Sequence, residues 1–463
     1  MVEPRVSHML PKMPDMTDSV APTAGSYMGG ADLSRALGRA GIPMLLWAAA
    51  LCYLVLSLPL LRGRALRGDF PVYYLSSRAF YDGANPYRAN FDRLAARLGL
   101  DNGMIKQATD PPSFIILFAP FSRLSAPAAF WTWSALMLAA LIASAIILLR
   151  QSGLPLPWQW SIGAIVALYP PVTNHFIYGQ NKILILLMLV LAMRAIALKS
   201  DGVAGLMIAM AALMRMFPLL LIGYLLLRRL RGAFWFTLGW LMVGGLLTVL
   251  IFGLGNTLGF AHAVGYLTRQ RWLTEHGNIS LDGFIDRVFA SLGTAVISRR
   301  GEVWRELTIG FCNLAIVAAI VRATLARPAI EDPDSRIFAL WVAAAVLLSP
   351  TAWFHYLTIM LIPFIGIAGA HDQGSIGGRG WWTMMLSLGF SIAFIGYGAN
   401  PYTRAIGAPL LYESGFLALL TGFISAYWFA VDGAELPPWR MILRLSWNRI
   451  FAREIATTPA LQS

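Results

Sequence analysis

Asp69 is a carboxylate in a setting where it could act as a base. It follows an apolar run directly, in the stretch GDFPVYYLSSRAFYDGANPY of residues 68–87. With Pro71 two residues later, Asp69 would begin a helix and cap its free backbone donors. The sharper hypothesis is a general base at the membrane surface, facing a lipid-borne substrate from the dry side. The two roles are compatible.

Arg215 is a cation in a segment that cannot be one regular helix. It lies in MRMFP, residues 214–218, where Pro218 forbids a helical hydrogen bond and disfavours helical geometry at Phe217. A charge this deep in a membrane protein is expensive and usually functional. The alternative is a single tilted helix whose arginine snorkels to the interface.

Lys182 opens another apolar segment, directly after two amide side chains. It would either contact a phosphate or anchor the helix at the headgroups. Gln180 and Asn181 would cap that helix, or hold the hydroxyls of a sugar. Together with Asp69, these residues are candidates for a polar site at one membrane edge.

The elements that carry these residues are membrane helices. Hydrophobic residues make up 57% of the chain and charged residues 13%, and the apolar residues fall in long blocks, which is typical of a polytopic membrane protein. The formal charge of +13 comes from basic residues at the ends of these blocks, where they would meet phospholipid headgroups rather than nucleic acid. The apolar runs are 44–61, 128–149, 158–171, 183–198, 233–254, 303–321, 337–348, 356–370, 381–397 and 410–430.

The distribution of arginine and lysine predicts the orientation. A cytoplasmic N-terminus places most basic connections inside, provided that residues 203–227 enter and return on the same side as two half-helices. One straight crossing would put RRLRG, residues 228–232, outside. We therefore predict cytoplasmic termini in an inner (plasma) membrane protein, with a disordered tail over 1–40, a membrane domain over 41–431 and a basic tail over 432–463.

Two long segments, 62–123 and 255–302, do not fit the membrane and fall on the extracytoplasmic side. In the first, Phe70, Tyr74, Ser77 and Tyr81 recur at helical spacing. Asn90 would cap a second amphipathic helix. Such helices lie along a membrane surface, and here they would roof a cavity between the spanning helices.

The order of several short motifs resembles that of glycosyltransferase family 87, polyprenyl-phosphate-sugar-dependent enzymes of the GT-C superfamily. An Asp, a Tyr pair, G-x-N-P-Y and P-P follow one another in the first loop. Similar motifs come later in the chain: GQNKILILL (179–187), the small-residue segment 204–218, NISLDGFIDR (278–287) and SPTAWFHY (349–356). The resemblance covers most of residues 44–370.

This resemblance implies an all-α GT-C-like bundle of about ten spanning helices plus a re-entrant or broken helix pair. It also implies inverting transfer of a mannose-like hexose, or a pentose, from a polyprenyl phosphate to an extracytoplasmic glycolipid or glycan. Asp69 would be the catalytic base, and the leaving phosphate would contact Arg215, Lys182, Arg287 and His355. The implied substrate-binding residues are Tyr73, Tyr74, Tyr87, Asp110, Gln180, Asn181, Asn278, Ser280 and Trp353.

Three positions depart from the family pattern. Arg215 stands where the pattern has Lys, which exchanges a point charge for a planar fork. Asp110 stands in DPP where an aromatic is usual; it would bind the acceptor, compete for the base role or, as we favour, cap a helix. Phe354 stands where a second histidine often sits, so His355 has no histidine neighbour for a proton relay. Trp353 and His355 also suit an ordinary interfacial belt.

The sequence predicts no metal site and no cofactor. The histidines are scattered without a carboxylate at ligand spacing, although Asp69 and Asp110 would offer oxygen ligands to a divalent cation on a donor phosphate. Cys52 and Cys312 lie in apolar blocks and build neither a disulfide framework nor a zinc cage. The competing functions are a lipid-linked sugar transporter or flippase, which also uses broken helices, and a glycan polymerase or ligase.

Overall fold

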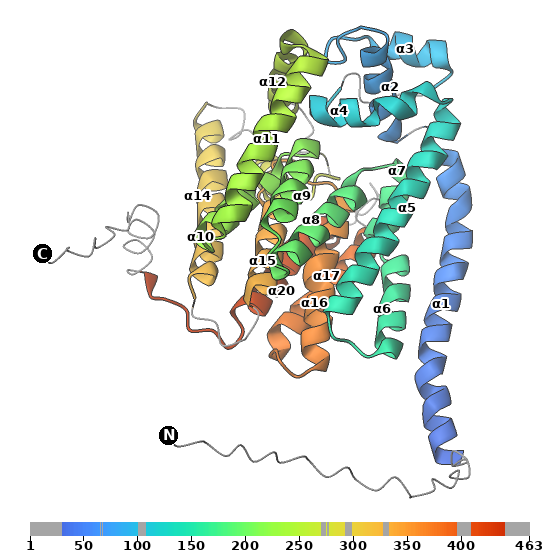
Figure 1. Ribbon diagram of the computed structural model, residues 1–463, viewed down its shortest axis with the longest axis vertical. Coiled ribbons are helices and arrows are strands. Elements are labelled where there is room, and N and C mark those ends of the chain that lie inside the picture. The colour runs from blue at the N-terminus through green and yellow to red at the C-terminus, as the bar shows by residue number, and fades with distance from the viewer. Residues whose placement is uncertain are drawn as a thin grey trace, which may run out of the picture.

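The computed structural model describes residues 30–64, 66, 68–100, 108–269, 275, 277–291, 299–326, 333–395 and 409–439. Most of the predicted N-terminal tail, residues 270–274 of the second long loop and most of the basic C-terminal tail lie outside these residues. Within them the fold is all α (Figure 1), and the extended pairing is an isolated bridge between Asn278 and Trp353.

Six helical segments in the described part of the chain are long and apolar enough to cross a membrane. They belong to α1 (Gly30–Arg64), α5 (Ala126–Gln151), α11 (Arg231–Phe252), α14 (Arg299–Thr324), η4 with α16 (Phe354–Met360 and Leu361–Asp372) and α20 (Ser414–Val431). At 1.5 Å per residue, 18 residues extend about 27 Å, close to the thickness of the hydrocarbon layer.

Shorter helices run between the same two ends of the bundle. They are α6 (Leu156–Leu168) continued by α7 (Pro170–Tyr178), α8 (Lys182–Ala197), α15 (Pro333–Leu347) and α17 (Gly378–Ala393). With the six long segments they confirm the predicted all-α polytopic membrane fold. The run 158–171 differs from its prediction, because α6 ends at Leu168, just before the Pro170–Pro171 pair, and α7 then continues to Tyr178.

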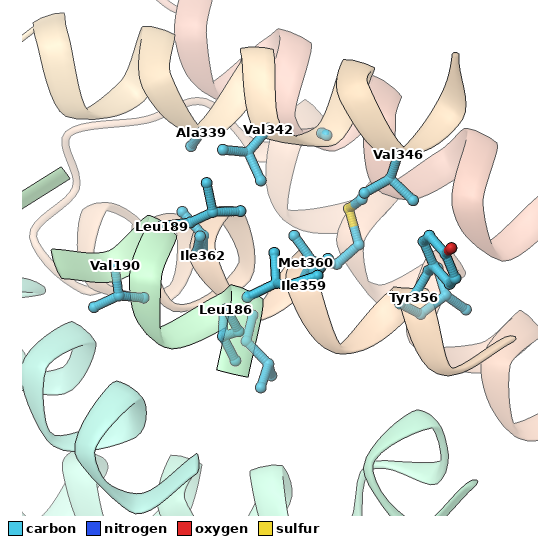
Figure 2. Packing of buried hydrophobic residues seen from close by; sticks show 14 of the residues in the cluster. Leu186, Leu189, Val190, Ala339, Val342, Val346, Tyr356, Ile359, Met360 and Ile362 are labelled. Atoms are coloured by element: carbon cyan, nitrogen blue, oxygen red, sulfur yellow. The ribbon is translucent and has the colours of Figure 1, made fainter. Parts of the chain in front are cut away.

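The bundle has apolar outer helices and a buried centre. In the apolar 18-residue stretches of α1 and of α11, only 11% of the residues are buried. In the corresponding stretch of Phe354–Asp372, 83% are buried. Outer side chains such as Trp235, Leu250 and Phe311 are exposed, as expected where lipid is the solvent. Figure 2 shows the centre, where Leu189 of α8 lies close to Val342 of α15 and Ile362 of α16.

The segment that contains Arg215 is broken, as predicted. α9 (Asp201–Met214) ends at Arg215, whose backbone is extended, and η2 (Phe217–Leu220) and α10 (Leu221–Leu227) follow. Asp201 and Arg231 line the same cavity, so the chain enters and returns at one end of the bundle. The break lies under the first long loop, where the Ser113 hydroxyl donates to the Leu213 carbonyl at 2.5 Å.

The first long loop forms a roof over the bundle (Figure 1). The predicted helix over residues 70–81 is confirmed as α2 (Phe70–Tyr81), and Asn90 caps α3 (Phe91–Leu98) by accepting from the Arg93 amide at 3.0 Å. The Tyr87 ring packs against Phe252 and Phe260 and so joins the roof to α11 and α12. The remaining elements are α4 (Pro112–Phe118), η1 (Ala119–Arg123), α12 (Leu254–Arg269), α13 (Leu281–Ser291) and α19 (Pro409–Tyr412).

Candidate active site

Two glycines bring the start of α2 against the turn between α7 and α8. A Cβ at Gly68 would lie 3.1 Å from the Cα of Tyr178, and one at Gly179 would lie 2.7 Å from the Cβ of Phe70. Gly179 also has a φ of +62°, which favours glycine. Residues without side chains at these positions therefore allow Asp69 to approach Gln180.

Asp69 occupies the N-cap position of α2, but its side chain makes no capping hydrogen bond. Its carboxylate instead accepts from Nε2 of Gln180. Asp69 is partly buried, while the neighbouring Phe70 is fully buried. The carboxylate therefore points to the bundle rather than to its own helix, which separates it from an ordinary cap.

Gln180 connects Asp69 to a cation and a phenol. Its Oε1 accepts from the Tyr73 hydroxyl at 2.7 Å and from Nζ of Lys182 at 3.0 Å. Lys182 is fully buried, also donates to Oδ1 of Asn181 at 2.6 Å, and lies 4.7 Å from the centre of the Tyr356 ring. Asn181 makes no cap, so both amides serve this polar cluster rather than the helix terminus.

Asp110 and Arg215 form the second half of the cluster. Nη2 of Arg215 lies 2.8 Å from Oδ1 of Asp110, whose side chain is 1% exposed. The pair lacks hydrogen-bond alignment, and neither carboxylate oxygen of Asp110 has a hydrogen-bond donor within the described residues. The favoured capping role of Asp110 is wrong, because Pro111 is the N-cap of α4. Arg215 also interacts electrostatically with Tyr73, whose hydroxyl donates to Gln180, and this connects the two halves.

The pKa of Asp69 is raised from 3.8 to about 6, chiefly by burial and also by the nearby Asp110. Lys182, Arg215 and the hydrogen bond from Gln180 lower the pKa of Asp69, but less than burial raises it. The result is a carboxyl group that is mostly ionised at pH 7 yet holds a proton more tightly than an exposed aspartate. A general base is most effective when its pKa lies near the working pH.

Two buried histidines lie on the inner side of the cluster. Nε2 of His175 accepts from the Ile183 amide at 3.1 Å, in the first turn of α8. His355 is 3% exposed, and its Nε2 has no hydrogen-bond partner in the described residues. His355 interacts electrostatically with Lys182 and Arg215, so the structure brings it to the two cations. His175 and Tyr356 were missed by the sequence reasoning, because no spacing pattern connects them to Asp69.

The segment beginning with Asn278 forms a clip rather than an open pocket. Oδ1 of Asn278 accepts from the Ala352 amide at 3.1 Å, and the Ser280 hydroxyl donates to the Pro350 carbonyl at 2.9 Å. A Cβ at Gly283 would lie 2.8 Å from the Asn278 side chain. These contacts hold α13 to the segment with Trp353, and they favour a structural role for Asn278 and Ser280.

Arg287 is also engaged within the protein. Its Nε and Nη2 donate to the two carboxylate oxygens of Glu413, at 2.9 and 2.6 Å. Its Nη1 donates to the carbonyls of Asn278 and Glu275, at 2.7 and 3.2 Å. This saturated fork favours a clamp between α13 and α20 over phosphate binding. Sequence reasoning missed Glu413, which lies 126 residues away.

The remaining tyrosines of the first loop hold the roof together. The Tyr74 hydroxyl donates to the Leu124 carbonyl at 2.8 Å, and the Tyr87 hydroxyl donates to the Asp110 carbonyl at 2.7 Å. Tyr87 therefore fixes the backbone that carries Asp110. Within the described residues, no group of three or more metal-ligating side chains occurs, and Asp69 and Asp110 each lie beside a cation, Lys182 and Arg215 respectively.

Comparison with known proteins gives a family for this arrangement. The model of glycosyltransferase family 87 matches residues 109–350, slightly more than half of the chain. The match includes Asp110, Gln180, Lys182, Arg215 and His175, and it begins after Asp69.

Two mycobacterial proteins are similar to this chain over much of their length. Both are described as polyprenol-phosphate-mannose-dependent alpha-(1-2)-phosphatidylinositol mannoside mannosyltransferases. The protein of Mycolicibacterium smegmatis is 27% identical over 347 residues, which cover 70% of this chain and 74% of that protein. The protein of Mycobacterium tuberculosis is 27% identical over 303 residues, which cover 62% and 60% respectively.

Proposed function

Because the chain belongs to glycosyltransferase family 87, we propose that it transfers mannose from a polyprenyl phosphate to a glycolipid at the extracytoplasmic face of the membrane. The choice of donor and acceptor is supported by the two relatives, whose names specify polyprenol phosphate mannose and phosphatidylinositol mannoside. The observation that carries the proposal is the joined cluster in which Gln180 contacts both Asp69 and Lys182.

In the proposed reaction, Asp69 removes the proton from the acceptor hydroxyl. The acceptor oxygen then forms a bond to the anomeric carbon from the side opposite the leaving group, while the bond from that carbon to the phosphate oxygen breaks. The bonding electrons leave with the polyprenyl phosphate, and the configuration is inverted. The proton resides on Asp69 at the end of the step, to be released to water.

Arg215 and Lys182 stabilise the charge that develops on the leaving phosphate. Arg215 is the more exposed cation, with 22% of its side chain accessible, and its planar fork suits two phosphate oxygens. Lys182 is fully buried and acts as a fixed charge behind Gln180. Asp110 and the ionised Asp69 together balance the two cations when no substrate is bound, and this limits the energetic cost of burying the charges.

Asp69→Asn tests the assignment of the base. With polyprenyl phosphate mannose as donor and a phosphatidylinositol mannoside as acceptor, we expect kcat to fall by roughly 10²–10⁴-fold, while donor binding is retained. Asp82→Asn is the matched control, because Asp82 lies at the other end of α2, is 45% exposed and pairs only with Arg78 in the described contacts. Unchanged turnover in Asp69→Asn would refute the role of Asp69 as base.

A further inference from the structure

A cavity of about 470 Å³ lies at the end of the bundle opposite the candidate active site, among the ends of α8 and α10 and the starts of α9, α11 and α15. One part of its wall is apolar and includes Met193, Ile196 and Phe338. The other part carries the cations Lys199, Arg229 and Arg231. Pockets for amphipathic small molecules have volumes of about 300–1,000 Å³, so this cavity is large enough for a lipid headgroup.

Within the residues that the structure describes, the three cations have no side-chain partner. In the described part of the chain, the side chains of Lys199, Arg229 and Arg231 make no hydrogen bond or ion pair. The cavity also contains two carboxylates, but Asp334 pairs with Arg228 at 2.5 Å. Asp201 lies against the first turn of α11, where a Cβ at Gly232 would collide with it, and a helix N-terminus favours that negative charge. Among the described residues, the cavity therefore has an excess of positive charge.

The backbone places two of these cations in an unfavourable conformation. Lys199 has a φ of 54° and Arg229 a φ of 58°, each just after a helix end where glycine is the usual residue. A turn alone would be served better by glycine. The cations also border exposed apolar residues: Leu198 is 65% exposed and Leu226 is 44% exposed. This combination is expected where lipid, rather than water, covers the surface.

We propose that this cavity binds the phosphate headgroup of an anionic phospholipid in the leaflet opposite the active site. Lys199, Arg229 and Arg231 contact the phosphate, and the apolar wall accepts the glycerol and the upper acyl chain. This leaflet is the cytoplasmic one in the orientation that the arginine distribution predicts. The proposal is independent of the transferred sugar, because the cavity shares no residue with the cluster around Asp69.

The test compares phosphatidylglycerol with phosphatidylcholine of the same acyl chains. Full-length protein is purified in detergent, and lipid binding is measured by native mass spectrometry and by the shift of the thermal unfolding midpoint. We expect the wild-type protein to prefer phosphatidylglycerol. Each removed charge should weaken phosphatidylglycerol binding by about fivefold, so that Arg229→Gln with Arg231→Gln weakens it by roughly 30-fold and leaves phosphatidylcholine binding unchanged.

Two controls keep the result interpretable. Arg150→Gln removes an exposed cation at the same end of the bundle but outside the cavity, and it should bind like the wild type. Arg229→Lys with Arg231→Lys keeps both charges and should retain most of the affinity, which excludes simple misfolding. Equal binding of phosphatidylglycerol by wild type and the double glutamine variant would overturn the site. Equal stabilisation by soluble glycerol phosphate would overturn its assignment to a lipid.

Discussion

The orientation of one amide determines how Asp69 is held. The Gln180 carbonyl is occupied by Tyr73 and Lys182, so its NH₂ group must face Asp69. The carboxylate therefore accepts a hydrogen bond that favours its ionised form, against the burial that favours the neutral form. If the Gln180 amide were turned round, its NH₂ group would face Lys182. The buried ammonium of Lys182 would then lose one of its hydrogen-bond acceptors.

The pH dependence of turnover should report on Asp69. Its pKa is raised to about 6, and the proposed base must be ionised, so kcat/KM should fall about tenfold per pH unit below pH 6. Gln180→Leu removes the hydrogen bond that lowers the pKa of Asp69, and it should move this acidic limb to higher pH. The measurement is a pH–rate profile of both proteins. An acidic limb that stays in place in the variant would contradict this account of the pKa.

At the scale of elements, the break between α9 and α10 places Arg215 of the membrane domain next to Asp110 of the roof. A continuous helix would hold Arg215 in a ladder of backbone hydrogen bonds, whereas the extended backbone at Arg215 turns the chain back beneath Asp110. The first long loop contributes the carboxylate of Asp110, and the break between α9 and α10 contributes the guanidinium of Arg215. The ion pair is thus also a joint between two elements.

Arg215 should consequently affect both stability and activity. Arg215→Gln leaves the buried Asp110 carboxylate without its counter-charge, which typically costs about 3–5 kcal/mol; we expect a lower thermal unfolding midpoint and loss of transfer. Arg215→Lys keeps the charge and should recover most of the stability, with kcat still reduced because the planar fork is lost. Thermal unfolding in detergent and donor turnover separate the two effects. If Arg215→Gln were as stable as the wild type, the ion pair with Asp110 would not stabilise the contact between these two elements.

The clip around Asn278 makes a second prediction for an element. Gly283→Ala would push a methyl group against the Asn278 side chain, whose Oδ1 accepts from the amides of Ser280 and Ala352. Such overpacking costs about 1–3 kcal/mol. Gly310→Ala is the matched control, since a Cβ at Gly310 in α14 meets nothing within 4 Å. Thermal unfolding midpoints should fall for Gly283→Ala only. A fall of equal size in both variants would argue against the clip.

At the scale of the whole molecule, the arrangement of helices was largely predictable. Hydrocarbon thickness sets the length of apolar runs, and Pro218 marks the break in α9 and α10 because a ring without an N–H cannot continue a helix. Asn90 was predictable as a cap because its side chain can accept from a free backbone amide at the start of a helix. The division of residues 158–171 was misplaced, although the Pro170–Pro171 pair was the signal for it.

The site was less predictable, because its contacts join distant parts of the chain. Asp69, Lys182 and Arg215 were candidates from local rules about charge in apolar surroundings. Their partners were not: the Arg215 contact to Asp110 and the Arg287 contact to Glu413 span over 100 residues each. For this reason the family resemblance implied a phosphate contact for Arg287, and a helix cap was the favoured role for Asp110. Only the packed structure shows which charges are already paired.

The orientation of the molecule in its membrane can be tested directly. In a protein with Cys52 and Cys312 replaced by serine, Asp82→Cys places a thiol on the roof and Lys199→Cys places one at the opposite end. We expect a membrane-impermeant maleimide to label intact cells at residue 82, and to label residue 199 only after the membrane is opened. The reverse pattern would put Asp69 in the cytosol and refute an extracytoplasmic active site.

The raised pKa of Asp69 has a consequence for handling the protein. Since the folded state binds this proton more tightly than the unfolded chain does, folding is weakened as the pH rises from 3.8 to about 6, and it stays weakened at neutral pH. The full shift corresponds to ~3 kcal/mol, which solvent access to Asp69 reduces to about 1 kcal/mol.

Asp69→Asn should therefore melt a few degrees higher than the wild type at pH 7.5, by differential scanning fluorimetry. An unchanged or lower melting point would mean that the carboxylate is better solvated than its burial indicates. If Asp69→Asn melts higher, as we expect, this inactive variant is the more stable protein in which to determine a structure with an intact donor.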